Sequence, residues 1–320
     1  MTTSENSTIT ANSVFLPVGY VDIEATLDGG QAFRWWRETD SADGGSSCTS
    51  AYRGVVDRRA VRVVEADGGL VVTPVDGKDS NGLSHKMLEY LGQDQDLEGF
   101  RTRFADDPCL GPALRGYSGL RVLRQDPWEA LFSFITSSTS NVPRIKLNVV
   151  SAAKKLGYSV GPDERDVAFP EPEVVAEAGE QFLRDLGFGF RAKYIAPAAE
   201  EVASGQLNLN DLREASYTEA REALTALHGV GEKVADCVLA FSLDKPESFI
   251  VDRHIIRALR KWYGLPEKAS LTYAADWARD FFGDHSALAN QYMFHRERLA
   301  HRASAWGGKH VERALSEDKN

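Results

Sequence analysis

The 320-residue sequence contains only three cysteines, Cys48, Cys109 and Cys237, and they lie far apart. Three separated cysteines exclude a disulfide framework, and they are too few for a four-thiolate zinc site or an iron–sulfur cluster. The seven histidines form no HxH or HxxxH pair beside an acidic residue, which argues against a metal-activated hydrolase. The sequence therefore predicts chemistry without a bound metal.

Long apolar runs are also missing, since no stretch approaches the roughly 20 residues that span a bilayer. The polar start, MTTSENSTITANS, has neither a basic segment nor an apolar one, so no export signal is expected. We therefore predict a cytoplasmic, nucleoid-associated protein with no membrane partner.

The sequence is short of positive charge. The 47 Asp and Glu against 37 Lys and Arg give a formal net charge of -10. Such an excess normally argues against a nucleic-acid partner, although a local basic patch stays compatible with it. Lysine supplies only 12 of the 37 cations, a composition that suits a high-salt cytoplasm. An unchanged melting temperature from low to molar salt would contradict that hypothesis.

The pattern along the chain changes near residue 108. Between Phe15 and Pro74, short alternating segments such as 32–36 and 60–64 are separated by Gly and Asp clusters, which predicts an antiparallel sheet. After residue 108 the apolar spacing is helical. The predicted fold class is α+β, with an N-terminal antiparallel β-sheet domain packed on an all-α body.

The predicted divisions are a disordered tail over 1–12, the β-rich domain over 13–108, the helical region over 109–309 and a C-terminal tail over 310–320. The Ser, Asp and Gly-rich stretch 39–50 is expected to be a mobile hairpin loop. One helix start is well marked, because Asp126, Pro127 and Glu129 occupy the N-cap, N1 and N3 positions. Further helices are expected over 144–156, 173–186, 192–204, 217–227, 233–242, 254–263, 273–282 and 287–306.

The segment 223–241 is the most informative. Gly229 and Gly231 flank Val230 between two predicted helices, and such a turn presents backbone N–H groups at the start of the second helix. Together with His228 it would hold a DNA phosphate without reading the base sequence. The alternative is a plain structural corner between helices. The carbonyl groups of the turn also suit a monovalent cation, and no other cofactor is expected.

Lys233 follows this turn, and Asp252 comes 19 residues later. A helix over 233–242 can turn back so that both side chains meet over one site. Breaking an N-glycosidic bond builds positive charge on the sugar, which a carboxylate stabilises, and a neutral amine can then attack C1′. The alternatives are a helix N-cap for Asp252 and a solvated helix residue for Lys233.

Several motifs, taken in order, resemble those of the eukaryotic-type 8-oxoguanine DNA glycosylases with abasic-site lyase activity, in the helix-hairpin-helix (HhH-GPD) superfamily. The resemblance runs from about residue 13 to 300. Its motifs are GGQAFRW at 29–35, LRQDPWEALFSFI at 123–135, LGFGFRAKY at 186–194, and the hairpin that leads to Lys233, Cys237 and Asp252.

The resemblance implies a role for each matching residue. Lys233 would be the nucleophile that forms a Schiff base, and Asp252 its electrostatic partner. The Gly30 carbonyl would accept the N7 hydrogen that distinguishes the lesion from guanine. Cys237 and Phe294 would sandwich the lesion base, whose Watson–Crick edge would be read by Asn290 or Gln291. Helical register favours Asn290, and side-chain chemistry favours Gln291.

Other residues would act on the rest of the duplex. Phe190 would fill the gap left by the extruded nucleotide, Arg144 and Arg191 would grip the estranged cytosine, and His254 would contact a phosphate. Thr139 stands where the family has an asparagine, so strict preference for the opposite base is in doubt. The structural alternatives are a turn glycine at Gly30, core packing of Cys237 and Phe190, surface salt bridges of Arg144 and Arg191, and a structural His254.

Together these features predict a monomeric, bifunctional glycosylase and lyase that excises 8-oxoguanine from double-stranded DNA. The first alternative is a monofunctional glycosylase for alkylated bases of the 3-methyladenine type. The second is a nonenzymatic helix-hairpin-helix protein that only binds DNA.

Overall fold

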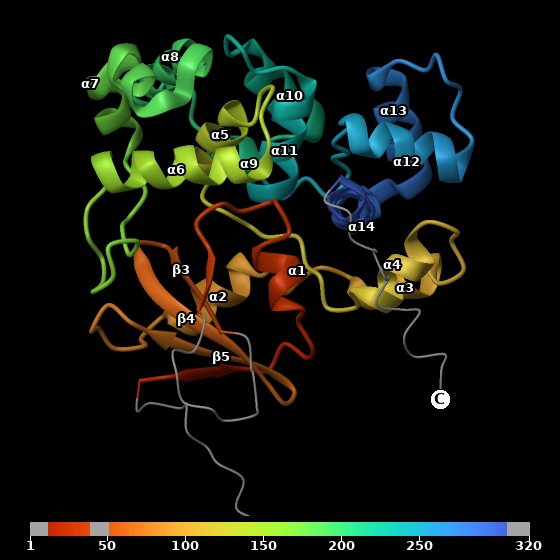
Figure 1. Cartoon of the computed structure of the whole chain (residues 1–320), viewed down its shortest axis with the longest axis horizontal. Helices are drawn as coiled ribbons and strands as arrows, with labels where there is room; N and C mark the ends of the chain where they lie inside the picture. The colour runs from red at the N-terminus through yellow and green to blue at the C-terminus, as the bar shows by residue number, and fades with distance from the viewer. Residues whose placement is uncertain (1–11, 39–50, 306–320) are drawn as a thin grey trace, which may run out of the picture.

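The computed structural model describes residues 12–38 and 51–305, the latter without side-chain detail beyond residue 300 (Figure 1). The predicted loop 39–50, with Cys48, and nearly all of the two predicted tails lie outside these ranges. In the described residues no helix is long and apolar enough to cross a membrane.

An antiparallel sheet is present as predicted; it has five strands and lies at the lower left of the molecule in Figure 1. Its spatial order is β1-β5-β4-β3-β2, and neighbouring strands are joined in the register Val63↔Val72 and Tyr52↔Val63. Tight turns connect β3, β4 and β5, and the turn from β4 to β5 accounts for the Asp and Gly cluster at 67–69. The strands are β1 (Val14–Leu16), β2 (Trp36–Glu38), β3 (Ala51–Val56), β4 (Arg59–Ala66) and β5 (Gly69–Pro74).

The predicted strand over 32–36 is wrong, because β2 begins only at Trp36. The preceding residues cross from one hydrophobic core to the other. Phe33 belongs to the core of the helical body, whereas Trp35 belongs to the core under the sheet. Arg34 forms an ion pair with Glu129 at 2.6 Å. The alternation that looked like a strand is therefore an alternation between two cores.

Two short helices cover the sheet. Helix α1 (Ile23–Leu27) begins at Asp22, whose side chain accepts from the Ala25 amide at 2.9 Å. Helix α2 (Leu83–Tyr90) contributes Leu83 and Met87 to the same core. Helix α3 (Leu97–Phe104) lies before residue 108 in the sequence, yet its Phe100 and Phe104 pack into the core of the helical body.

The helical body follows. The Asp126 side chain accepts from the Glu129 amide at 2.9 Å, which confirms the predicted start of the helix at Pro127. The other predicted helices agree with the structure to within two residues, with one exception described below. The helices are α4 (Leu110–Gly116), α5 (Pro127–Thr136), α6 (Val142–Leu156), α7 (Pro172–Leu183), α8 (Ala192–Ala203), α9 (Asp211–Glu214), α10 (Tyr217–Ala226), α11 (Glu232–Ser242), α12 (Arg253–Tyr263), α13 (Leu271–Phe282) and α14 (Ser286–Ala305).

The exception is the helix predicted over 173–186. Its α-helical part ends at Leu183, and a π-helical segment, η1 (Arg184–Phe188), continues it. Gly179, with a φ of 74°, interrupts the helical geometry inside α7. Glycine takes this left-handed conformation at little cost, so the helix bends there.

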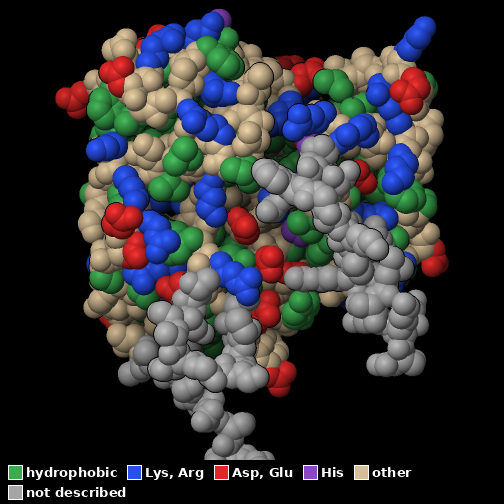
Figure 2. Space-filling view, viewed as in Figure 1, with side chains coloured by type: hydrophobic (Ala, Val, Ile, Leu, Met, Phe, Trp, Pro, Cys, Tyr) green, Lys and Arg blue, Asp and Glu red, His purple; other side chains and the backbone are tan. Residues whose placement is uncertain are grey.

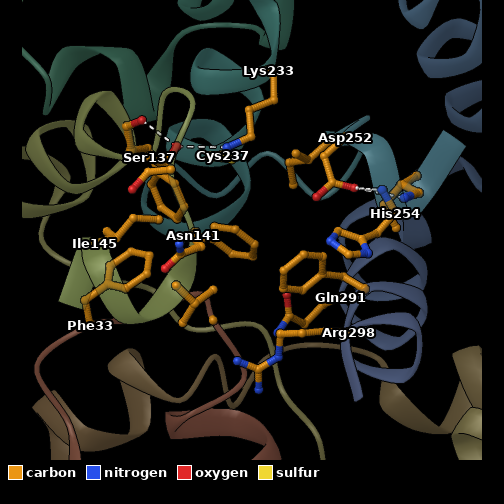
Figure 3. Close-up of a pocket in the computed structure, with 18 of the residues that line it drawn as sticks. Phe33, Ser137, Asn141, Ile145, Lys233, Cys237, Asp252, His254, Gln291 and Arg298 are labelled. Atoms are coloured by element: carbon orange, nitrogen blue, oxygen red, sulfur yellow. Dashed lines mark hydrogen bonds between the residues drawn. The ribbon is translucent and has the colours of Figure 1, made fainter. Parts of the chain in front are cut away.

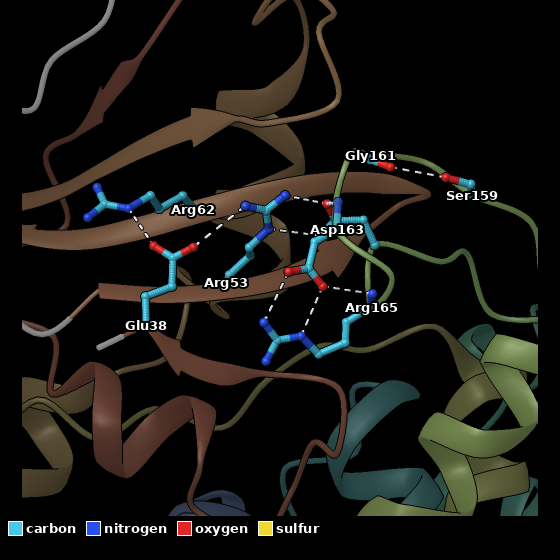
Figure 4. A network of polar contacts seen from close by, with 8 residues as sticks. Glu38, Arg53, Arg62, Ser159, Gly161, Asp163 and Arg165 are labelled. Atoms are coloured by element: carbon cyan, nitrogen blue, oxygen red, sulfur yellow. Dashed lines mark hydrogen bonds and ion pairs between the residues drawn. The ribbon is translucent and has the colours of Figure 1, made fainter. Parts of the chain in front are cut away.

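Polar contacts join the sheet to the helical body along the loop between α6 and α7 (Figure 4). Arg53 on β3 holds the fully buried carboxylate of Asp166 by two hydrogen bonds, one of them 2.9 Å long. Glu38 on β2 pairs with Arg62 at 2.7 Å and with Arg53 at 3.6 Å. These contacts fix the orientation of the sheet beside the helices.

Asp236 anchors α11 against α10 and provides a test by pH. Its buried carboxylate accepts from the Tyr217 hydroxyl at 2.7 Å, and burial raises the pKa of Asp236 to about 6. A carboxyl whose pKa is raised on folding stabilises the folded protein while it stays protonated. The unfolding free energy therefore falls as the pH rises from the unfolded-state pKa near 4 through the folded-state pKa near 6. Relative to Asp236→Asn, the wild type should lose about 1 to 2 kcal/mol of unfolding free energy between pH 5 and pH 7.5.

Urea denaturation of both proteins at several pH values would measure this difference. A difference that stays constant with pH would show that Asp236 titrates normally.

Candidate active site

A cavity of about 670 Å³ opens between the turn after α1 and the helices α6, α11, α12 and α14 (Figure 3). Its size suits a small ligand or a single base. The structure brings eight sequence-predicted residues to its wall: Gly30, Lys233, Cys237, Asp252, His254, Asn290, Gln291 and Phe294.

Lys233 lies in the first turn of α11 and points into this cavity (Figure 3). Its Nζ donates a hydrogen bond of 2.9 Å to Ser137 Oγ and lies 5.8 Å from the centre of the Phe134 ring. The side chain is half-buried, which contradicts the alternative of a solvated helix residue. In the described part of the chain its amine forms no ion pair with a carboxylate.

Asp252 faces the same cavity from the start of α12. Its Oδ1 accepts from the backbone amides of His254 and Ile255, both at 2.8 Å, so it is also the helix N-cap. The two suggested roles are compatible, because the cap bonds fix the carboxylate in place beside the cavity.

Cys237 is one helical turn beyond Lys233 and is almost completely buried, yet it lines the cavity. Burial raises the pKa of Cys237 to about 11, an effect that the neighbouring charge of Lys233 reduces. The sulfur is therefore a thiol at neutral pH. It lies in the hydrophobic core as well as on the cavity wall, so both interpretations of this residue describe its position.

Gly30 occupies a turn whose backbone conformation favours glycine. Its φ is 90°, and a Cβ atom there would lie 3.0 Å from Cε1 of Phe294. The buried side chain of Gln31 holds this turn, since it donates to the carbonyls of Thr26 and Arg121 and accepts from the Leu123 amide. The backbone at Gly30 is thus fixed against the ring of Phe294.

Asn290 and Gln291 both line the cavity but differ in their partners. Asn290 Nδ2 donates to the Ile250 carbonyl at 2.8 Å, which ties α14 to the segment before Asp252. Gln291 Nε2 donates to the Gly29 carbonyl at 3.3 Å, beside Gly30. The amide of Asn290 is therefore engaged in holding the backbone, and Gln291 lies next to the turn of Gly30.

A second group of predicted residues lies beside the cavity without lining it. Phe190, in the short turn η2 (Gly189–Arg191), is 44% exposed, so a buried aromatic at this position is wrong. The Arg191 guanidinium stacks 4.6 Å from the centre of that ring. Arg191 donates to the carbonyls of Ser138 at 2.6 Å and Thr139 at 2.7 Å.

Arg144 donates to the Gly187 carbonyl at 3.1 Å. Within the described residues neither Arg144 nor Arg191 forms a salt bridge, contrary to the structural alternative. Burial and the nearby charge of Arg144 lower the pKa of Arg191. The two guanidinium groups therefore lie close enough to repel, an arrangement that an anionic or acceptor-rich partner would relieve.

The hairpin between α10 and α11 leads directly to Lys233. Gly229 has a φ of 88°, and a Cβ there would lie 2.2 Å from the Tyr194 ring, so glycine is required. His228, Gly229 and Gly231 are exposed, and Gly231 caps α11 without a side-chain hydrogen bond. Val230 is buried and anchors the turn. The free amides at this helix start are suited to an anion.

His254 is buried at the start of α12, where its ring contacts both arginine neighbours. Arg253 donates to its Nε2 at 3.3 Å, and Arg257 lies 3.0 Å from its Nδ1. The ring also lies edge-to-face with Phe294, with centroids 6.3 Å apart. His254 therefore has structural contacts in addition to its position on the cavity wall.

Several cavity residues were missed by sequence reasoning. Asp28, Lys146 and Arg298 form a polar cluster at the wall, in which Lys146 Nζ lies 3.3 Å from Asp28 Oδ1 and Arg298 donates to the Asp28 carbonyl at 2.7 Å. Ser137 was not given a role from the sequence. The signal for the other three is proximity to predicted residues, since Asp28 precedes the motif at 29–35, Lys146 follows Arg144 and Arg298 follows Phe294.

Basic side chains are exposed on the surface in spite of the acidic total. Figure 2 shows Lys and Arg side chains spread over much of this face, with Asp and Glu side chains among them. In the described part of the chain, no group of three or more His, Cys, Asp or Glu side chains is arranged to hold a metal ion.

Two family models match the chain in sequence order. The N-terminal domain of 8-oxoguanine DNA glycosylase matches residues 13–131. The HhH-GPD superfamily base excision DNA repair protein matches residues 136–277.

Individual relatives agree with these models. An N-glycosylase/DNA lyase OGG1 from Arabidopsis thaliana is 32% identical over 253 residues, which cover 76% of this chain and 66% of the plant protein. The match thus spans just under two thirds of that relative. A Clostridium acetobutylicum 8-oxoguanine glycosylase/lyase, solved with double-stranded DNA containing cytosine opposite 8-oxoG, is 28% identical with a TM-score of 0.80, over 90% of this chain and 96% of that one. MBOgg1, solved with a low-affinity DNA ligand, is 31% identical with a TM-score of 0.82, over 91% and 96%.

Proposed function

The chain belongs to the 8-oxoguanine DNA glycosylases of the HhH-GPD superfamily, and from this membership we propose that it excises 8-oxoguanine from double-stranded DNA and cleaves the abasic site. One observation carries the proposal. Lys233 and Asp252 face a single cavity large enough for a base, directly behind a hairpin suited to phosphate. The amine can attack the sugar, the carboxylate can stabilise the positive charge that develops on it, and the hairpin can hold a neighbouring phosphate of the DNA.

The first step releases the base. The lone pair of Lys233 Nζ forms a bond to C1′ while the C1′–N9 bond breaks, and its electron pair leaves with the base, which takes up a proton. Positive charge develops on the sugar during this step, and the carboxylate fixed at Asp252 stabilises it. The damaged nucleotide must first leave the stack, at a cost of a few kcal/mol.

The second step cuts the strand. Opening of the sugar at C1′–O4′ transfers a proton from the nitrogen to O4′ and leaves a protonated Schiff base. The Schiff base acidifies the C2′ proton. Loss of that proton forms the C2′–C3′ double bond and expels the 3′ phosphate, so this β-elimination needs no metal and no redox partner.

Lesion recognition rests on the turn of Gly30 and on α14. The Gly30 carbonyl is proposed to accept the N7 hydrogen of 8-oxoguanine, with the base between Cys237 and Phe294. Gln291 is proposed to read the Watson–Crick edge, because its amide lies beside Gly30 and has a longer bond of 3.3 Å to the Gly29 carbonyl, whereas the amide of Asn290 is bonded to Ile250 at 2.8 Å. DNA phosphates are proposed to bind at the hairpin and at the start of α12, through His228, Gly229, Val230, Gly231 and His254. A monovalent cation is also proposed to bind at the hairpin.

The opposite strand is assigned to the residues beside the cavity. Phe190 is proposed to fill the vacated gap, which its exposure permits, and Arg144 and Arg191 to bind the unpaired cytosine. The chain is proposed to act as a monomer in the cytoplasm.

The test is base release from a duplex containing 8-oxoguanine, with borohydride added to trap the Schiff base. We expect a covalent enzyme–DNA adduct and a cut strand. A glycosylase for alkylated bases would instead release 3-methyladenine without an adduct, and a protein that only binds DNA would leave an abasic site intact. Lys233 and the fixed turn at Gly30 favour the first outcome.

Thr139→Asn should increase both stability and opposite-base preference. Thr139 has a φ of 51°, a left-handed conformation that is unfavourable for a β-branched residue and better tolerated by asparagine. We expect the unfolding free energy to rise by about 0.5 to 1 kcal/mol. The asparagine would also supply the amide that the resemblance to the family implies at this position.

Urea denaturation and excision from four duplexes that differ only in the opposite base would measure both effects. Equal excision profiles for wild type and Thr139→Asn would show that this position does not set the preference.

A further inference from the structure

The turn over residues 137–140 connects the catalytic amine with the residues proposed to bind the opposite strand. At its beginning, Ser137 closes α5 and lines the cavity. The Ser137 hydroxyl donates to the Phe134 carbonyl at 2.7 Å and accepts from Lys233 Nζ at 2.9 Å. A hydroxyl has one proton, so once that proton is given to the carbonyl, the oxygen faces the amine as an acceptor.

The hydrogen bond to Ser137 Oγ restricts the position of the Lys233 amine. A lysine side chain has four rotatable bonds and loses much freedom only when its end is held. Here Ser137 holds one N–H of the amine, and the lone pair of a neutral amine must then point in a direction set by that bond. A nucleophile displaced by about 1 Å can lose a factor of about 100 in rate.

The next two residues of the turn hold Arg191. Its guanidinium donates to the carbonyls of Ser138 at 2.6 Å and Thr139 at 2.7 Å. The turn is closed by the Ser140 amide, which donates to the Ser137 carbonyl at 3.2 Å. Arg191 also stacks on the exposed Phe190. A guanidinium that turns toward a base in the opposite strand must change these two bonds, which lie one and two residues from Ser137.

We propose that this turn is a positioning element in which Ser137 orients the amine of Lys233 and Arg191 adjusts that orientation according to the base opposite the lesion. The inference rests on the proposed function and extends it, because it makes the catalytic amine sensitive to the opposite strand. Ser137 acts through Lys233 and is a positioning residue, not a catalytic one.

The competing explanation is that Ser137 only stabilises the end of α5. Thr136 offers a matched control, since its hydroxyl also donates to a carbonyl of its own helix, at 2.8 Å to Phe132, but it is fully buried and does not line the cavity. Thr136→Val removes that bond without touching Lys233.

The experiment uses the full chain and a matched pair of variants. Ser137→Thr keeps the hydroxyl, and Ser137→Val removes it while its side chain has nearly the same volume as that of threonine. On a duplex with 8-oxoguanine opposite cytosine, Ser137→Val should lower the single-turnover rate of adduct formation by about 10- to 100-fold, with duplex affinity unchanged. Ser137→Thr should recover most of the rate, and Thr136→Val should match the wild type.

The same measurement with adenine opposite the lesion tests the dependence on Arg191. The rate ratio between the cytosine and adenine duplexes should be smaller in Ser137→Val than in the wild type. An equal ratio, or an equal adduct rate in Ser137→Val and Ser137→Thr, would overturn the inference. An inactive wild type would reject the proposed function itself, whereas an active wild type with an equally active Ser137→Val would reject this inference alone.

Discussion

Replacing Lys233 with glutamine should abolish the borohydride-trapped adduct and lower strand cleavage by at least about 1,000-fold. Glutamine keeps most of the length and polarity of the side chain, but its amide nitrogen is not nucleophilic and forms no Schiff base. The carboxylate of Asp252 and the cavity stay in place, so duplex binding should be nearly unchanged. Gel analysis of trapped adducts and of nicked strands measures both steps.

Lys146→Gln is the matched control, because Lys146 is a second lysine on the wall of the same cavity. Its amine is paired with Asp28 at 3.3 Å, whereas the amine of Lys233 meets the neutral Ser137 hydroxyl. An amine paired with a carboxylate is less available for attack, so the adduct should persist in Lys146→Gln. An adduct that persists in Lys233→Gln and disappears in Lys146→Gln would assign the nucleophile to Lys146 instead.

The elements that the sequence predicted well depend on local chemistry. The start of α5 follows from Asp126, Pro127 and Glu129, whose capping interactions span only four residues. The hairpin before Lys233 follows from two closely spaced glycines, of which Gly229 adopts a φ of 88°. Such features depend on residues that are close together in the sequence, and the structure confirms them.

The contacts that the sequence could not show join residues far apart along the chain. The Lys233–Ser137 hydrogen bond spans 96 residues, and no periodicity relates its two ends. The same holds for Asn290, whose amide meets Ile250, 40 residues away. Helical register alone therefore could not show that the amide of Asn290 bonds to a distant segment, whereas that of Gln291 lies beside the turn of Gly30.

The misassigned strand at 32–36 has the same origin. Apolar residues at alternate positions indicate a strand only when one face of the segment is buried. Phe33 and Trp35 are both buried, but in different cores. Sequence patterns report that a side chain is buried and not which core receives it.

Replacing Asp166 with alanine should lower the unfolding free energy by about 1.5 to 3 kcal/mol, because it removes the charge-assisted hydrogen bonds that the buried carboxylate accepts from the partly buried guanidinium of Arg53. Asp166 is completely buried, and besides Arg53 it accepts from the Asp163 amide at 2.9 Å. Asp163→Ala is the control in the same loop. The carboxylate of Asp163 pairs with the exposed Arg165, and such a surface pair contributes about 1 kcal/mol or less.

Urea denaturation of the two variants measures the difference, and similar small losses would show that the buried pair does not hold the sheet in place. A large loss at Asp166 has a consequence for the site. Gly30 reaches the cavity from the part of the chain that carries the sheet, whereas Lys233 and Asp252 reach it from the helices. In the Asp166→Ala variant, the sheet should separate from the helices at a lower temperature than in the wild type. As the temperature rises, release of 8-oxoguanine should therefore decrease before cleavage of a preformed abasic site, because cleavage needs the amine of Lys233 but no contact with the lesion. Parallel loss of both activities would instead indicate that the two parts unfold together.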